Sequence, residues 1–353
     1  MIWLLLLFTA ICLTNVKFNF KTIFKDYLGK SQTNAIRGIF AILIFFSHFT
    51  TYVSLESNFG DNIYLKIISS IGQLMVAPFL FYSGYGIYCS AKKKPNYIKT
   101  FPKHRFLKTL VFFDLAVIPY LIIALVRGSS YNIWHILLSF TGWTSLGNSN
   151  WFMFAILMLY IFIYLSALFT KRKINLKTIL ITTMFTIGYI FLVNYFKQGA
   201  TYWTDTVLCF SGGMLVAHFK DKIDSLLKRK AILCTLFCIV ICATLFFIKT
   251  KTAGLPYIFI YNVLSIFFCL TVSVLTSRIQ INNRILQFLG TYGFEIYILQ
   301  RIPDILLQPI LGQYTVPFFF ASLIVTLVIS IIFKRLTAIL IEKPHKNHLL
   351  SRL

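Results

Sequence analysis

The stretch NAIRGIFAILIFFSHFTTY, residues 34–52, is an apolar run with an arginine near its start and a histidine near its end. An apolar run of this length is typical of a helix that crosses a bilayer, for which about 20 residues are needed. Charged and titratable groups inside such a helix are costly and mark functional positions by default. The stretch therefore predicts a membrane helix that carries part of a functional site.

The composition of the chain extends this prediction to the whole protein. Of the 353 residues, 58% are hydrophobic and only 12% are charged, whereas soluble domains have about 25% charged residues. The apolar runs are continuous rather than alternating, which favours helices over a barrel. We expect an all-α, polytopic transmembrane helix bundle of about 11 spans. The expected spans are residues 2–16, 36–54, 67–90, 106–126, 150–169, 177–195, 203–219, 231–249, 257–277, 288–311 and 316–340.

The positive charge of the chain, formally +24, is distributed unevenly between the connections. Of the 34 Lys and Arg residues, 28 fall in every second connection and at the C-terminal end, and 6 fall on the other side. By the positive-inside rule this predicts an N-terminus outside and a C-terminus in the cytoplasm, in the cell membrane. Membrane orientation thus explains the positive charge, and no nucleic-acid partner is expected. The seven cysteines form no CxxC pair, so we expect neither a disulfide framework nor a metal site.

Arg37 and His48 share one face of their predicted helix. Eleven residues at 100° each give three turns plus about 20°, with an axial rise of about 16 Å. Taken alone, Arg37 fits a snorkelling anchor, and His48 fits a core histidine bonded to a neighbouring helix. Together they suit a cation that holds an anionic ligand at the cytoplasmic mouth and an imidazole that acts as a base deeper in the membrane.

Several further stretches are similar to one known family. They are FYSGYGIY (81–88), RFLK (105–108), NSNWFMFAILMLYIFIY (148–164), LGTYGFEIYILQ (289–300) and IEKP (341–344). With the Arg-x10-His pair, they resemble the acyltransferase-3 family of integral-membrane acyltransferases over roughly residues 31–345. The resemblance implies an acyltransferase domain with a ten-helix core in residues 31–345. The apolar run at residues 2–16 and the lysines that follow it predict a membrane anchor and basic linker in residues 1–30, and residues 346–353 are expected to form a short cytoplasmic tail.

The chain departs from the family pattern at several positions. Gly293, Gln300 and Ala155 stand where the family usually has Ser, His and Glu. The acidic residue that usually follows the histidine is not obvious, and the nearest carboxylates are Glu56 and Asp61. The partner that orients the histidine and the identity of the acceptor therefore stay open.

The resemblance implies transfer of an acyl group, usually acetyl, from cytoplasmic acyl-CoA to a hydroxyl of a cell-surface or exported glycan. Acyl-CoA would be a co-substrate, and no permanently bound cofactor is expected. The phosphates of CoA need cations, and His48 would take the proton of the attacking hydroxyl. The cations expected near CoA are Arg37, Arg105, Lys108 and Lys103, and the candidates for substrate or oxyanion contacts are Ser83, Tyr85, Trp151, Asp114 and Glu295.

Two other interpretations are compatible with the sequence. One is a polytopic transporter of a glycan or of a lipid-linked precursor, which would also show many helices and scattered cations. The other is a catalytically silent scaffold, favoured by the departures from the family pattern and opposed by the intact Arg37 and His48. The sequence specifies neither the acyl group nor the acceptor sugar nor the oligomeric state.

Overall fold

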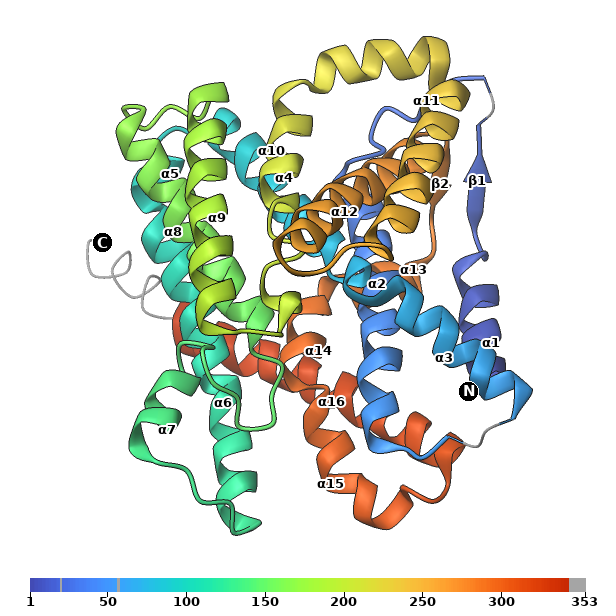
Figure 1. Ribbon diagram of the computed structural model, residues 1–353, viewed down its shortest axis with the longest axis vertical. Coiled ribbons are helices and arrows are strands. Elements are labelled where there is room, and N and C mark those ends of the chain that lie inside the picture. Colours follow the sequence, from blue (N-terminus) through green and yellow to red (C-terminus); the bar gives the residue numbers. More distant parts are fainter. Residues whose placement is uncertain (20, 56–57, 343–353) are drawn as a thin grey trace, which may run out of the picture.

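The computed structural model describes residues 1–19, 21–55 and 58–342, without the side chains of residues 340–342. This part of the chain is almost entirely helical, with one pair of short strands (Figure 1). The predicted IEKP motif, the tail at residues 346–353 and Glu56 lie outside the described residues or side chains.

The helices are α1 (Ile2–Cys12), α2 (Lys30–Phe49), α3 (Phe59–Ile71), α4 (Ala77–Lys93), α5 (Tyr97–Phe101), α6 (Lys108–Val126), α7 (Ile133–Ser139), α8 (Trp151–Phe169), α9 (Leu176–Phe196), α10 (Cys209–His218), α11 (Lys220–Lys249), α12 (Gly254–Ser277), α13 (Arg284–Thr291), α14 (Gly293–Leu299), α15 (Arg301–Leu311) and α16 (Thr315–Glu342). The strands β1 (Val16–Phe18) and β2 (Ile279–Ile281) pair antiparallel, with Val16 opposite Ile281.

The predicted fold class is confirmed. Within the described residues, eight helical segments are long and apolar enough to cross a membrane. They are residues 30–52, 59–93, 97–126, 151–169, 176–196, 220–249, 254–277 and 315–339. The protein is therefore an all-α, multi-pass helix bundle.

The expected span at residues 203–219 contains only a short helix, α10. The chain before it is irregular, and the side chain of Asn262 on α12 replaces the missing helical hydrogen bonds. Its Nδ2 donates to the carbonyl of Thr204 at 2.8 Å, and its Oδ1 accepts from the backbone N–H of Leu208 at 2.9 Å. Irregular backbone inside a bundle is tolerated where its polar groups are satisfied in this way.

The expected span at residues 288–311 is interrupted twice, at Tyr292 between α13 and α14 and at Gln300 between α14 and α15. Pro303 lacks a backbone N–H, so it cannot bond the carbonyl of Leu299 as a continuous helix would require. The Gln300 side chain at this second interruption is buried and reaches His48 of α2, where it contributes to the site described below.

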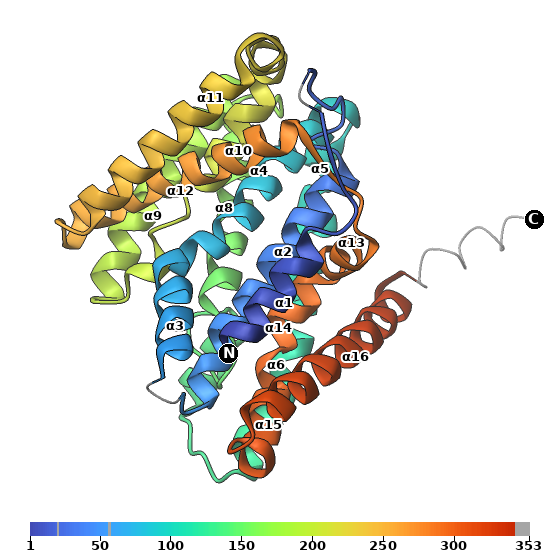
Figure 2. The ribbon, with the colours of Figure 1, turned by 90° about the vertical axis from the view of Figure 1, so that its right-hand side faces the viewer.

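Helix α2 runs through the middle of the bundle, between the group of α4 and α12 and the group of α14 and α16 (Figure 2). It crosses α13 at two glycines. A Cβ added to Gly38 would lie 2.0 Å from the carbonyl oxygen of Leu286, and one on Gly290 would lie 1.8 Å from that of Asn34. Only glycine fits at both positions, because each helix leaves no room for a side chain on the other.

Further along the same side of α2, aromatic rings pack against α16. Phe46 and Phe319 lie 4.8 Å apart between ring centroids, and Phe49 and Phe318 are separated by the same distance. Such pairs contribute about 0.5–1.5 kcal/mol each beyond the area they bury. With one face fixed to α16, α2 presents its polar face to the interior.

Two basic segments, residues 92–108 and 220–230, lie at one end of the bundle, which we call the basic end (Figure 1). Here α11 turns at Lys230, whose backbone is non-helical. A π-helical turn, Pro102–Leu107, joins α5 to α6 and contains Arg105. Single π turns are frequent at functional sites, because the extra residue re-aims a side chain.

Candidate active site

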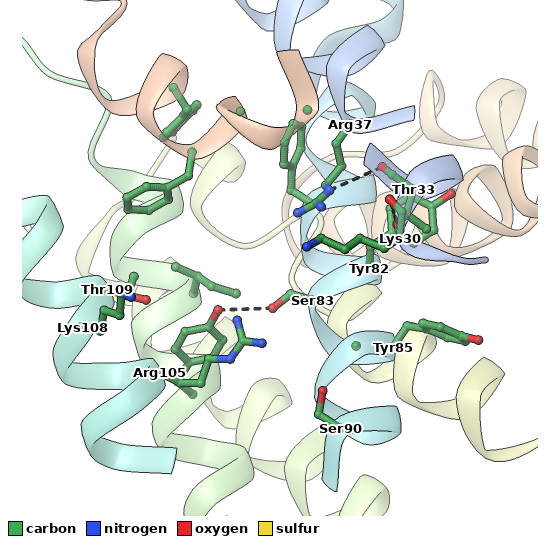
Figure 3. Close-up of a pocket in the computed structure, with 18 of the residues that line it drawn as sticks. Lys30, Thr33, Arg37, Tyr82, Ser83, Tyr85, Ser90, Arg105, Lys108 and Thr109 are labelled. Carbon is green, nitrogen blue, oxygen red and sulfur yellow. Dashed lines mark hydrogen bonds between the residues drawn. The ribbon is translucent and has the colours of Figure 1, made fainter. Parts of the chain in front are cut away.

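A cavity of about 660 Å³ lies between α2, α4, α6, α8 and the α13–α14 junction and extends to Lys93 and Lys94 of the basic end (Figure 3). Its lining is strongly cationic. The basic residues that line it are Lys30, Arg37, Lys93, Lys94, His104, Arg105 and Lys108. The lining carboxylate, Glu295, is paired with Lys334 of α16 at 3.4 Å. The cavity therefore suits an anionic ligand of cofactor size.

Arg37 extends from α2 into this cavity and is anchored by the preceding helical turn (Figure 3). Its Nε donates to the carbonyl of Thr33 at 3.4 Å, and Nη2 donates to Oδ1 of Asn34. These bonds fix the guanidinium at the α2–α13 crossing and leave its remaining N–H groups for a ligand.

The facing wall comes from α4, α6 and α8. Nε of Arg105 donates to the hydroxyl of Tyr97 at 3.2 Å, so the π turn aims this guanidinium along the cavity. Ser83 of α4 lies 3.4 Å from the hydroxyl of Tyr160 on α8. In Figure 3 Arg105 and Lys108 lie across the cavity from Arg37. A ligand between them would meet cations on both sides.

The deep end of the cavity is closed by aromatic rings. Phe152 and Tyr297 meet edge to face, with their ring centroids 5.2 Å apart, and both line the cavity beside Ile44 of α2. His48 is one helical turn beyond Ile44, and its ring lies 6.2 Å from that of Tyr297. The imidazole is thus separated from the cationic cavity by a single layer of side chains.

His48 receives its polar contacts from two distant parts of the chain. Its Nδ1 lies 2.8 Å from Nε2 of Gln300 and 3.4 Å from Oγ of Ser149. Gln300 is fully buried, and its Oε1 has no hydrogen-bond partner among the described residues. The contacts fix the ring plane and leave Nε2 as the nitrogen available to a reactant.

The structure brings most of the predicted site residues to the cavity. Those that line it are Arg37, Arg105, Lys108, Ser83, Tyr85 and Glu295. Four do not line it. Lys103 is exposed on the outside of the π turn, Asp114 lies further along α6, Trp151 packs edge-on against Phe152 and Tyr202, and His48 lies beyond the deep end.

Three residues outside the predicted set complete the site, namely Gln300, Ser149 and Tyr297, of which Gln300 was noted only as a departure from the family pattern. All three fall inside stretches that carried the family resemblance, LGTYGFEIYILQ and the residues around NSNWF. Membership in these two stretches was the sequence signal that could have identified the three residues. Which side chains would point at the imidazole depended on the break before α15.

A family model described as an acyltransferase domain matches residues 31–335. Comparisons with curated proteins and with solved structures returned no match. The matched region contains α2, the cationic cavity and both segments that contact His48. The chain therefore belongs to the acyltransferase-3 family and is a multi-pass membrane protein with an acyltransferase domain.

Proposed function

We propose that the protein transfers an acetyl or other short acyl group from acyl-CoA to a hydroxyl of a cell-surface or exported glycan. The observation that carries the proposal is the arrangement along α2. This one helix presents Arg37 to a cationic cavity and His48 just beyond the deep end of the same cavity. A ligand with an anionic head and a reactive far end matches that order of groups.

Acyl-CoA has this shape and charge. Its diphosphate and 3′-phosphate would lie among the basic residues, where Arg37 and Arg105 provide paired N–H donors and the lysines provide point charges. The extended pantetheine arm would follow α2 for about the 16 Å of axial rise between Arg37 and His48. The thioester would then arrive at Phe152 and Tyr297.

His48 would act as the general base. Half a turn of the Gln300 amide exchanges its Oε1 and Nε2 in the same space. With Oε1 facing His48, it accepts a hydrogen bond from the Nδ1–H of His48, and the Nε2 of His48 then carries a lone pair. Nε2 removes the proton of the acceptor hydroxyl as its oxygen attacks the thioester carbonyl. The C–S bond then breaks, and the CoA sulfur leaves as the thiol after taking up that proton.

The negative charge on the thioester oxygen requires a hydrogen-bond donor. Tyr297 is suited to this role because it lines the deep end of the cavity, and its buried hydroxyl has no hydrogen-bond partner among the described residues. Ser83 and Tyr85 lie along the cavity wall, and Trp151 lies outside the lining. The ring centroid of Tyr297 lies 6.2 Å from that of His48.

The proposed reaction also sets an orientation. The basic end would face the cytoplasm, where acyl-CoA is available, and residues 31–345 would form the catalytic domain in the cell membrane. Residues 1–30 would add an N-terminal anchor and basic linker. The unequal distribution of Lys and Arg supports this orientation.

Mass spectrometry of surface glycans from cells with and without this gene tests the function directly. We expect a glycan that loses a fixed acyl mass in the absence of the gene, and that mass identifies the acyl group and its carrier together. Identical glycan masses in both cells, combined with movement of a glycan across the membrane by the purified protein, would favour a transporter instead.

Binding of acyl-CoA tests the donor site. Arg37→Ala should weaken acyl-CoA binding about ten- to a hundredfold, because a charge-assisted hydrogen bond contributes about 1.5–3 kcal/mol. Arg37→Lys should recover only part of this loss, because a lysine lacks the paired donors. Lys103→Ala is the control, since Lys103 is exposed outside the cavity. Equal effects of the Arg37 and Lys103 substitutions would contradict the assigned site.

A further inference from the structure

A second, open groove of about 800 Å³ lies near the start of α8, away from the basic end. Two connections form its walls, the one between α7 and α8 and the one between α9 and α10. Its lining combines aromatic rings with neutral polar groups. Aromatic residues in the lining include Trp143, Tyr195, Phe196, Tyr202 and Trp203, and polar residues include Thr144, Asn150 and Gln198.

Lys197 fixes the floor of this groove. Its Nζ lies 4.2 Å from the ring centroid of Trp143 and 4.6 Å from that of Trp203, and it donates to the carbonyl of Trp143 at 2.9 Å. Burial against the rings lowers the pKa of Lys197. The two indoles are 5.6 Å apart between centroids. One side chain thus ties the two walls together, and the surface is formed before any ligand binds.

The rim of the groove carries rings that are open to a ligand. Tyr195, Phe196 and Tyr202 expose 69%, 61% and 41% of their surface. An aromatic face carries negative charge density and attracts polarised C–H groups, which sugars present on the flat sides of their rings. The hydroxyl and amide groups of Thr144, Asn150 and Gln198 suit the hydroxyls at a sugar's edge. A purely lipid-facing surface would not need these polar groups.

The start of α8 links the groove to the surroundings of His48. Asn150 lines the groove, Ser149 lies 3.4 Å from Nδ1 of His48, and Phe152 lines the cationic cavity. Trp151 packs edge-on against Tyr202 of the groove. The four consecutive residues 149–152 therefore contact the groove, His48 and the cationic cavity.

We propose that this groove binds the saccharide acceptor and presents its hydroxyl to His48 from the side opposite acyl-CoA. This inference rests on the proposed acyl transfer. Tyr202 and Tyr195 act as stacking surfaces for the sugar, and Lys197 positions the indoles beneath them. The acceptor is a saccharide, and it enters by a route separate from that of the donor.

Binding to the full-length protein in nanodiscs tests this directly. The probes are short neutral oligosaccharides of glucose or N-acetylglucosamine and anionic oligogalacturonates, with contact measured by saturation-transfer NMR. We expect contact with at least one of these classes, and a loss of affinity of about tenfold in Tyr202→Ala, for a lost stacking contact of about 1.4 kcal/mol. The affinity for acyl-CoA, measured separately by calorimetry, should stay at the wild-type value.

Tyr314→Ala is the matched control. Tyr314 is an exposed tyrosine between α15 and α16 that does not line the groove, so a role as a membrane-interface anchor would affect both variants equally. Wild-type saccharide binding in Tyr202→Ala, or equal losses in the two variants, would overturn the inference. Failure of acyl-CoA to bind the wild-type protein would instead overturn the proposed function, whatever the saccharides do.

Discussion

His48 is oriented by two neutral groups, the amide of Gln300 at 2.8 Å and the hydroxyl of Ser149 at 3.4 Å. A neutral partner fixes the tautomer and plane of an imidazole without the charge stabilisation that a carboxylate gives to the imidazolium. The proton that His48 takes from the hydroxyl should therefore pass quickly to the leaving sulfur. In this account Gln300 is a positioning residue, because it acts on the reaction through His48.

Replacing Gln300 by leucine should lower kcat about ten- to a hundredfold, by analogy with the groups that orient metal-binding histidines. The KM for acyl-CoA should not change, because Gln300 does not line the donor cavity. Gln300→His should keep much of the wild-type rate, in contrast to Gln300→Leu, because a histidine can also hydrogen-bond His48. The ionisation of the new histidine should appear in the pH–rate profile. A wild-type rate with an unchanged pH profile in Gln300→Leu would contradict this role.

The sequence predicted the functional pair Arg37 and His48 on α2, but it did not predict the hydrogen-bond partners of His48. Arg37 and His48 needed only the period of one helix. Asp61, one of the two carboxylates nearest in sequence, is instead bonded to the N-terminal amine of Met1 at 2.9 Å. Gln300 is 252 positions away from His48, so its contact depends on how the helices assemble.

The crossing of α2 and α13 is the element-scale feature that fixes the cavity wall. Gly290→Ala should destabilise the protein by about 1–3 kcal/mol, because its Cβ would lie 1.8 Å from the carbonyl oxygen of Asn34. The thermal midpoint in detergent should fall, and acyl-CoA affinity should fall with it, because Arg37 is anchored to Asn34.

Gly188→Ala on α9 is the control for this substitution. A Cβ at Gly188 would have no neighbouring atom within 4 Å, and alanine is the better helix former by about 1 kcal/mol. Its thermal midpoint should therefore stay the same or rise. An equal loss of stability in both glycine variants would show that the crossing is not the cause.

The continuous helices were predictable to within a few residues, and the interrupted ones were not. Residues 150–169 were expected, and α8 covers Trp151–Phe169. Gly293 and Pro303 favour breaks within residues 288–311, but they do not by themselves show which side chain a break brings to the site. Those breaks and the π turn at Pro102–Leu107 depend on backbone satisfaction and packing, yet they place Gln300 and Arg105.

The whole molecule has two unlike approaches to His48. The cationic cavity ends one layer of side chains short of His48 on the side of the basic end, and the aromatic groove is lined by Asn150, next to the Ser149 that contacts His48. The bias of Lys and Arg was readable from the sequence. The separation of the two approaches by Phe152 and Tyr297 was not, because it arises from helices that are far apart in the chain.

The proposed orientation predicts the accessibility of epitope tags. A tag at Ser129, in the connection after α6, should be reached by antibody in intact cells. A tag after Leu353 should be reached only after permeabilisation, because 28 of the 34 Lys and Arg residues would lie in the cytoplasm. The reverse pattern would place the cationic cavity on the wrong side for cytoplasmic acyl-CoA.

We propose above that His48 acts as the general base while an acyl group passes from CoA, held near Arg37, to a hydroxyl acceptor. The most direct measurement uses the purified protein in proteoliposomes, isotopically labelled acetyl-CoA, and glycan from cells that lack the gene. Wild-type protein should label the glycan. His48→Ala should bind acetyl-CoA with wild-type affinity and transfer no label, whereas labelling by His48→Ala at the wild-type rate would contradict the account.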